Sequence, residues 1–221
     1  MRLSLNEVEG GCLKAARGAG LPYGLAQEAG RAARCLALYG LPWCGPLLAA
    51  LEAFEKQEQE RTGLNLTADT ARLTGGPSAL LLGPAASDVW RAGLMEDRPL
   101  VIEAPDQPLF CLAALALGVA EGAAPLLLRW EGGSLGLGRE GNGLLGALPE
   151  AGSALEIQPL DRDADAAGGR DLLSAAPGCL ETGCPADPDC WAALASYAAR
   201  TLVPESPESQ AGAGAGAIDN D

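Results

Sequence analysis

The longest uncharged apolar stretch of the chain runs over the twelve residues from Leu109 to Ala120 and ends at Glu121. It is too short to span a bilayer as a helix, which takes about 20 apolar residues. A helix with apolar side chains on every side has to be buried between other elements of the fold. The stretch therefore predicts a central core helix with layers of structure packed around it.

The composition is that of a globular protein with a substantial core. The chain has 221 residues, of which 48% are hydrophobic and only 4% aromatic. A compact fold of this size removes roughly 70% of the unfolded chain's surface from water. Leu, Ala and Val must therefore supply most of the core, and we expect one domain or one domain with a small helical subdomain.

Charge and the start of the chain limit the partners. The formal net charge is −14, with 15 basic residues against 29 acidic ones. Binding to nucleic acid requires clustered Lys and Arg, so we expect no nucleic-acid partner, and anionic membrane surfaces are excluded for the same reason. The first residues turn polar at once, without the apolar region of a signal peptide. We therefore predict a cytoplasmic protein with no membrane partner.

Residues 1–62 are predicted to form an N-terminal helical segment of about three helices. Ser4 and Glu7 match a capping box, which opens a helix over residues 5–17. Pro and Gly at the two ends of residues 22–40 are typical of a second helix. A third helix is expected to begin at Pro46.

Residues 63–204 are predicted to form a mixed α/β body. The apolar runs Ala79–Leu82, Leu100–Glu103 and Pro125–Trp130 alternate with helical patterns. Strands that are apolar on both faces are typical of a parallel sheet covered on each side. We therefore predict the mixed α/β class, with the helical segment packed on a small, mostly parallel sheet with covering helices. The α+β class is the alternative.

Residues 205–221 are predicted to form a Gly/Ala-rich C-terminal arm. Its composition is that of a linker, and its functional interpretation is an arm that docks against a protein partner or a second copy of the chain. The residues assigned to this interaction are Gly212, Gly214, Gly216, Ile218, Asp219, Asn220 and Asp221.

The absence of histidine is the most informative single fact about chemistry. Catalytic triads then lack their usual base and histidine zinc sites lack their ligand. Residues 132–136 fit the nucleophile-elbow pattern G-x-S-x-G, but without a histidine we interpret them as a glycine-rich hairpin. Residues 136–141 fit the dinucleotide motif G-x-G-x-x-G, but a poor helix start follows them.

Three cysteines, Cys179, Cys184 and Cys190, cluster near the start of the last predicted helix. Their spacing fits neither a zinc knuckle nor a ferredoxin run. We predict free thiols, leave a reversible disulfide open, and expect no metal and no cofactor.

The predicted anion-binding residues are Lys14, Arg17, Arg31 and Arg34, which recur at helical spacing on the first two helices. If these helices form an antiparallel hairpin, the four cations would converge on one small anion, and arginine offers bidentate geometry. The alternative is an ordinary solvated face paired with neighbouring glutamates.

The predicted acid–base residues are Glu103 and Asp106. Ligands of open parallel sheets bind beyond the carboxyl ends of the strands, which here are residues 83–88 and 103–106. Burial behind three apolar residues would raise the pKa of Glu103 and fit it for proton transfer. The alternative is a strand end that emerges into water.

Both ends of the chain resemble one bacterial family of unknown function, DUF3726. The resemblance is carried by residues 3–7, by residues 14–26 around Gly18-Ala19-Gly20, and by Gly212–Gly216 with Asp219-Asn220-Asp221. It implies no activity, cofactor or catalytic residue. It does imply that the turn after the first helix and the terminal arm belong to the working design of the protein.

Two functions therefore stay open at the level of sequence. The first is a binding or assembly protein that uses the helical hairpin and the C-terminal arm. The second is an enzyme that acts on an anionic metabolite without histidine or metal, with Arg17 and Arg31 holding the anion and Glu103 or Asp106 handling protons.

Overall fold

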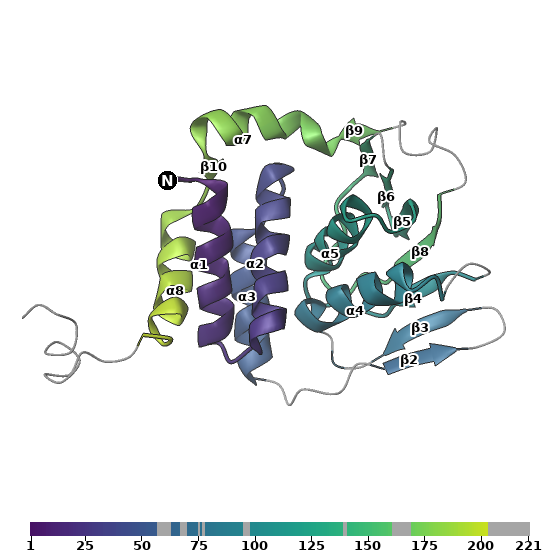
Figure 1. The fold of residues 1–221 in the computed structure, drawn as a ribbon, viewed down its shortest axis with the longest axis horizontal. Coiled ribbons are helices and arrows are strands. Elements are labelled where there is room, and N and C mark those ends of the chain that lie inside the picture. The colour runs from purple at the N-terminus through teal and green to yellow at the C-terminus, as the bar shows by residue number, and fades with distance from the viewer. Residues whose placement is uncertain are drawn as a thin grey trace, which may run out of the picture.

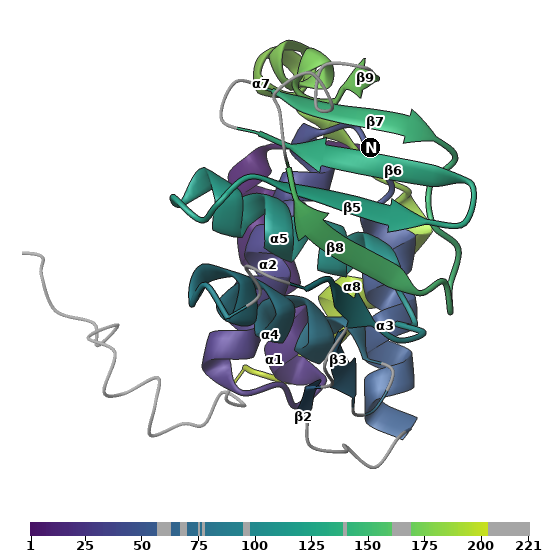
Figure 2. The same ribbon diagram turned by 90° about the vertical axis from the view of Figure 1, so that its right-hand side faces the viewer.

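The protein is arranged in three layers. The computed structural model describes residues 1–56, 63–66, 70–74, 76, 78–94, 98–138, 141–160 and 169–202. A layer of helices and a β-sheet lie on opposite sides of two central helices (Figure 1). Viewed onto the sheet, the two central helices lie directly behind it and the helical layer lies behind them (Figure 2).

The helical layer contains the first three helices and the last one. It comprises α1 (Leu5–Gly18), α2 (Tyr23–Leu38), α3 (Cys44–Lys56) and α8 (Pro188–Ala199). The predicted capping box is present: the Glu7 N–H donates to Ser4 Oγ at 3.2 Å, and the Ser4 N–H donates to Glu7 Oε2 at 2.7 Å. The start of α8 is capped by Asp187, which accepts from the Cys190 N–H at 2.8 Å.

The central layer consists of α4 (Ala79–Arg91) and α5 (Pro108–Ala120). Helix α5 is the predicted core helix, and nearly all of its residues are buried. It contacts α2 on one side and α4 on another, with the sheet beyond. An apolar helix in this position satisfies the requirement that none of its faces meets water.

Eight strands form one sheet in the described part of the chain, in the order β2-β3-β4-β8-β5-β6-β7-β9. Their bounds are β2 (Gly63–Leu66), β3 (Ala71–Thr74), β4 (Leu100–Ile102), β5 (Leu126–Trp130), β6 (Gly133–Leu137), β7 (Asn142–Gly146), β8 (Leu155–Pro159) and β9 (Arg170–Asp171). A separate pair joins β1 (Arg2–Leu3) to β10 (Cys184–Pro185). Along the chain, the 3-10 helix η1 (Leu172–Ala175) and α7 (Ala176–Thr182) lie between β9 and β10.

The mixed α/β class is confirmed, but the prediction of a mostly parallel sheet is wrong. Only β3 and β4 pair in parallel among the described strands, and the other pairs are antiparallel. Strand β5 lies inside the sheet between β8 and β6. Leu126, Leu128 and Trp130 on one of its faces are buried, whereas on the other face Leu127 is buried and Arg129 is exposed. The apolar run therefore does not require a parallel sheet covered on each side.

The predicted strand at Ala79–Leu82 is also wrong, because these residues begin α4. The following Gly83 and Pro84 were expected to end a strand, but they lie inside the helix. A Cβ on Gly83 would lie 3.1 Å from the Cys111 Cα of α5. The glycine thus permits close contact between two helices, and a four-residue apolar run could not distinguish this from a strand end.

The glycine-rich hairpin is confirmed. Strands β5 and β6 pair antiparallel with Trp130 opposite Gly133, so residues 132–136 form no strand-to-helix elbow. The second motif, residues 136–141, lies between β6, which ends at Leu137, and β7, which begins at Asn142, so both flanking elements are strands; residues 139 and 140 lie outside the described residues. A dinucleotide motif has to join a strand to a helix, and that junction is absent here. Among the helices of the described residues, none is both long and apolar enough to cross a membrane.

Candidate ligand-binding site

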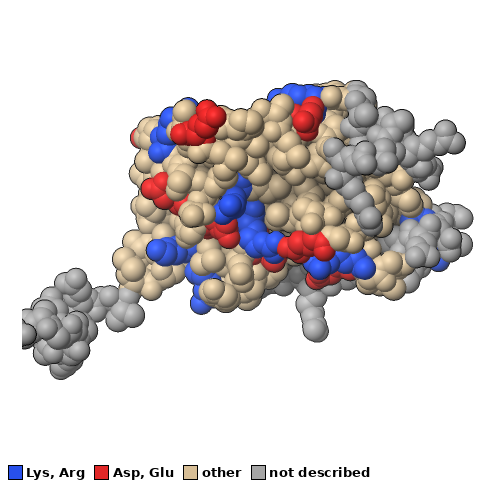
Figure 3. Space-filling model, turned by 45° about the horizontal axis from the view of Figure 1, so that its top comes forward, with Lys and Arg blue, Asp and Glu red and all other residues tan. Residues whose placement is uncertain are grey.

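A large hollow lies between α2 and α5. Its volume is about 710 Å³, which is within the range of small-molecule sites. Its walls come from both helices, from the β6–β7 turn at Gly138 and Gly141, and from Leu173 of η1. Figure 3 shows this side of the molecule, where basic and acidic side chains gather around a depression in a mostly uncharged surface. We call this hollow the α2–α5 cavity.

Two of the predicted anion-binding residues, Arg31 and Arg34, line the α2–α5 cavity. They lie three residues apart on α2, so they project from the same face of the helix. The Nη1 of Arg34 donates to Asn6 Oδ1 at 2.8 Å and to Glu9 Oε2 at 3.0 Å. Its Nε and Nη2 meet no acceptor among the described residues, so this guanidinium has donors to offer to a ligand.

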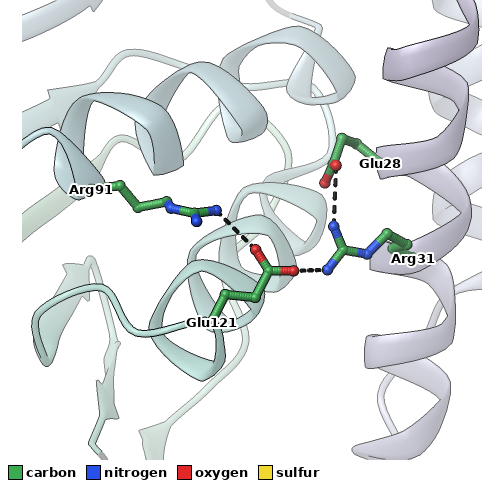
Figure 4. Close-up of polar contacts among 4 residues, drawn as sticks. All are labelled: Glu28, Arg31, Arg91 and Glu121. Carbon is green, nitrogen blue, oxygen red and sulfur yellow. Dashed lines mark hydrogen bonds and ion pairs between the residues drawn. The ribbon is translucent and has the colours of Figure 1, made fainter.

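Arg31 is engaged differently, in an ion-pair network that joins the helical layer to the central layer. Its Nη1 donates to Glu28 at 3.2 Å and its Nη2 donates to Glu121, which also accepts from Arg91 at 2.8 Å (Figure 4). The hydrogen bond from Arg31 is the main reason that the pKa of Glu121 lies below its ordinary value. With two carboxylates on its terminal nitrogens, Arg31 is a weaker anion ligand than Arg34.

The end of the cavity next to the sheet carries neutral polar groups. The Asn142 amide of β7 donates to the Tyr39 hydroxyl at 2.9 Å. Burial raises the pKa of Tyr39, and it raises the pKa of Cys35 to about 12. Both side chains therefore stay protonated at neutral pH, where neither serves as a base or a thiolate nucleophile.

The remaining walls of the cavity are apolar. Leu38 of α2 faces Leu117 and Val119 of α5 across it. A ligand that fills the space would bury apolar surface against these leucine and valine side chains, while its polar groups meet Arg34 and Tyr39. Apolar walls with few polar groups are the usual composition of a small-molecule site.

The other two predicted cations do not reach the cavity. Arg17 lies in the last turn of α1, where its Nη1 donates to the Leu21 carbonyl oxygen at 2.7 Å and closes the turn before α2. Lys14 is exposed and is not among the residues that line the cavity. The structure thus brings together two of the four predicted residues. Arg31 and Arg34 lie on α2, which packs against α5, whereas Lys14 and Arg17 lie on α1, which packs against α2 and α8.

The predicted acid–base residues lie elsewhere, after β4. Glu103 is half exposed and pairs with Arg72 at 2.6 Å. Asp106 accepts from the N–H groups of Ala79 and Gln107, at 2.8 and 2.7 Å, and burial raises its pKa. It therefore caps α4. Since residues 83–88 belong to α4, the predicted cleft between strand ends is not formed. The argument that placed Glu103 and Asp106 in such a cleft as proton-transfer groups therefore no longer applies.

The three clustered cysteines are free thiols and do not form one group. Cys179 donates to the Ala37 carbonyl oxygen at 3.2 Å. Cys190 lies at the start of α8 near Cys44, since the adjacent Trp43 and Trp191 rings meet edge to face with centroids 6.1 Å apart. No group of three or more Cys, Asp or Glu side chains in the described ranges is arranged to hold a metal ion.

The C-terminal arm, including all seven residues assigned to it, lies outside the described residues.

The cavity also contains residues that sequence reasoning missed, above all Tyr39 and Asn142. They are 103 residues apart in the sequence and belong to no motif, so no local pattern indicated them. Leu173 was likewise unpredicted.

Residues 3–76 match the model of a family described as a protein of unknown function, DUF3726. This match supports membership in that family. The resemblance seen in the sequence is thus confirmed over the N-terminal third of the chain, which includes Arg31 and Arg34. Its C-terminal part lies outside the matched residues. No curated protein matches the sequence.

Two solved structures show weak likeness to the fold. Malate dehydrogenase from Entamoeba histolytica has a TM-score of 0.45 and 11% identity, over 72% of this chain and 49% of that chain. A dehydrogenase from Sinorhizobium meliloti has a TM-score of 0.49 and 15% identity, over 91% of this chain and 94% of that chain. This chain spans about half the length of the malate dehydrogenase, and neither likeness is high enough to transfer an activity.

Proposed function

We propose that this protein binds a small organic anion in the α2–α5 cavity, with Arg34 as its principal ligand. The observation that carries the proposal is that two donors of Arg34, Nε and Nη2, meet no acceptor among the described residues at the wall of a cavity of about 710 Å³. A guanidinium that keeps two adjacent N–H groups available can bind a carboxylate or phosphate bidentately.

The surrounding groups support an organic anion over an inorganic one. The walls contributed by Leu38, Leu117 and Val119 are apolar, and a bare ion would leave them in contact with water. A ligand with an apolar body would cover them, and each buried methylene group contributes about 0.8 kcal/mol. The Tyr39 hydroxyl and Asn142 offer neutral hydrogen bonds at the far end.

Binding is supported better than catalysis. The protonated Tyr39 and Cys35 supply no base, and the one carboxylate among the described lining residues, Glu9, is paired with Arg34 at 3.0 Å. Glu103 and Asp106 are not among the residues that line the cavity. An assembly role for the helical hairpin and the arm stays a prediction, since the arm lies outside the described residues. The cytoplasmic location and a homo-oligomeric or protein partner are likewise expectations.

The test is a thermal-shift screen of carboxylates, phosphates and nucleotides, followed by titration of each hit into variants. Arg34→Gln is expected to weaken binding of a true ligand by about tenfold or more, as for loss of a charge-assisted hydrogen bond. Arg200→Gln is the matched control, because Arg200 is similarly exposed and also pairs with one glutamate, Glu55, but does not line the cavity. Equal affinity in both variants, or no hit, would refute the proposal.

A further inference from the structure

A second hollow adjoins the α2–α5 cavity. It has a volume of about 560 Å³ and lies between the start of the chain, at Arg2–Asn6, and the last turn of α7. Arg34 lines both hollows. The guanidinium that carries the proposed function therefore stands between two spaces, and we call the two together the Arg34 groove.

One short segment borders both parts of the Arg34 groove. Leu173 of η1 lines the first hollow and Leu180 of α7 lines the second. They are seven residues apart in a continuous helical run, so they lie on one face about two turns apart. Their exposures, 43% and 70%, are high for leucine, and such exposure often marks an interaction site.

The arginine in the middle of the Arg34 groove differs from the other two in its hydrogen bonding. Three arginines line the two hollows, and the outer two are engaged. Arg31 donates through both Nη atoms to Glu28 and Glu121. Arg2 donates through Nε and Nη2 to oxygen atoms of Thr182 and Gly183.

Carboxylates also line both hollows: Glu9, which pairs with Arg34 at 3.0 Å, lines the first and Glu181 lines the second. A second anionic group in either hollow would therefore meet one of these acids and an arginine that is already paired. Arg34, whose Nε and Nη2 have no acceptor in the described part of the chain, is the place for a single negative charge.

From this arrangement we infer that the ligand is an elongated organic anion whose one negative charge lies between two apolar arms, as in a dialkyl phosphodiester. The inference rests on the proposed function and specifies its ligand class. One arm lies against Leu38 and Leu117, and the other lies against Leu180 and the start of the chain. The anion sits at Arg34, where the two hollows meet.

The experiment is an NMR titration of the full-length ¹⁵N-labelled protein with three probes. Dimethyl phosphate and dibutyl phosphate carry the same central charge and differ only in the length of their arms. Suberate carries its charges at the two ends of an apolar chain. We expect dibutyl phosphate to bind about tenfold more tightly than dimethyl phosphate, because its arms bury apolar surface, and more tightly than suberate.

Variants separate the two arms and separate this inference from the proposed function. Leu180→Asn is expected to weaken dibutyl phosphate binding several-fold and to leave dimethyl phosphate unchanged. Leu202→Asn is the matched control, since Leu202 is 71% exposed and does not line the groove. Arg34→Gln is expected to weaken both phosphates.

The outcomes are distinguishable. If Arg34→Gln weakens both phosphates but they bind equally, or Leu180→Asn changes neither, the elongated ligand is refuted and the proposed function stands. Tighter binding of suberate than of dibutyl phosphate has the same consequence. If Arg34→Gln leaves the affinity for every probe unchanged, the proposed function itself fails.

Discussion

Helix α2 packs against its two neighbours in different ways. Toward α1 it presents Gly30, where a Cβ would lie only 2.7 Å from the Glu9 carbonyl oxygen. On the side where it lines a cavity of about 710 Å³ together with α5, it presents Arg31, Arg34 and Leu38, and Arg34 also reaches Asn6 and Glu9 of α1. Small residues let two backbones approach, whereas long side chains that need water or counter-charges hold the helices apart. Helix α2 therefore packs closely in the core on one side and lines a ligand-sized cavity on another.

The largest effect on stability is expected from adding a side-chain atom where α2 and α1 are in close contact. Gly30→Ala places a methyl group against the backbone of α1, and we expect it to lower the free energy of unfolding by about 1–3 kcal/mol. Gly24→Ala, on the same helix with nothing within 4 Å of its Cβ position, should raise it by up to about 1 kcal/mol. Urea denaturation measures both. If the two variants are equally stable, the close packing of this face is wrong.

On the open face, Tyr39→Phe removes the hydroxyl that accepts from Asn142. We expect a loss of about 1 kcal/mol in the free energy of unfolding, the usual net value of one hydrogen bond. Chemical denaturation of the variant tests this, with Tyr23→Phe as control because Tyr23 is 62% exposed. A loss as large as that of Gly30→Ala would mean that this side of α2 is also tightly packed.

The variant Glu9→Gln tests how charge in the α2–α5 cavity affects anion binding. Removing a negative charge that lies 3.0 Å from Arg34 should raise the affinity for dimethyl phosphate about threefold, as expected for a screened charge several ångströms away. NMR titration provides the measurement. Glu52→Gln, an exposed position on α3, is the control and should bind like the unmodified protein. A decrease in affinity with Glu9→Gln would count against Arg34 as the anion ligand.

The smallest effect on stability is expected from the ion pairs that join α2 to the end of α5. Glu121→Gln should cost about 0.5 kcal/mol of unfolding free energy at pH 7, because the network is partly exposed and screened by solvent. Since Arg31 lowers the pKa of Glu121 below its ordinary value of 4.5, the folded protein holds this carboxylate ionised where the unfolded chain would protonate it. The stabilisation is therefore present above about pH 4.5 and is lost as the pH falls through the lowered pKa.

Denaturation curves of the unmodified protein and of Glu121→Gln should accordingly converge as the pH falls below 4.5 and through the lowered pKa. A stability difference that stays unchanged once the pH is low enough to protonate Glu121 in the folded protein would show that the carboxylate acts by packing and not by charge. Raising the salt concentration to about 1 M at pH 7 should shrink the same difference, because exposed ion pairs are screened.

Local signals in the sequence determined the first helix, the core helix α5 and one hairpin. The capping box at Ser4 and Glu7, and the apolar stretch of α5, depend on neighbouring residues and on periodicity, and both were predicted correctly. The same holds for the hairpin of β5 and β6, because glycines at a turn constrain the backbone directly. Local chemistry also placed Arg31 and Arg34 on one face of one helix.

Tertiary structure decided the pairing of the strands and the composition of the site. Whether Leu126–Trp130 pairs in parallel depends on β8, which arrives from about thirty residues downstream, and no local pattern contains that choice. Tyr39 and Asn142 likewise meet only because β7 lies beside the end of α2. Gly83 could end a strand or admit a neighbouring helix, and only the approach of α5 decides between them, since a backbone contact is a property of two segments and not of one.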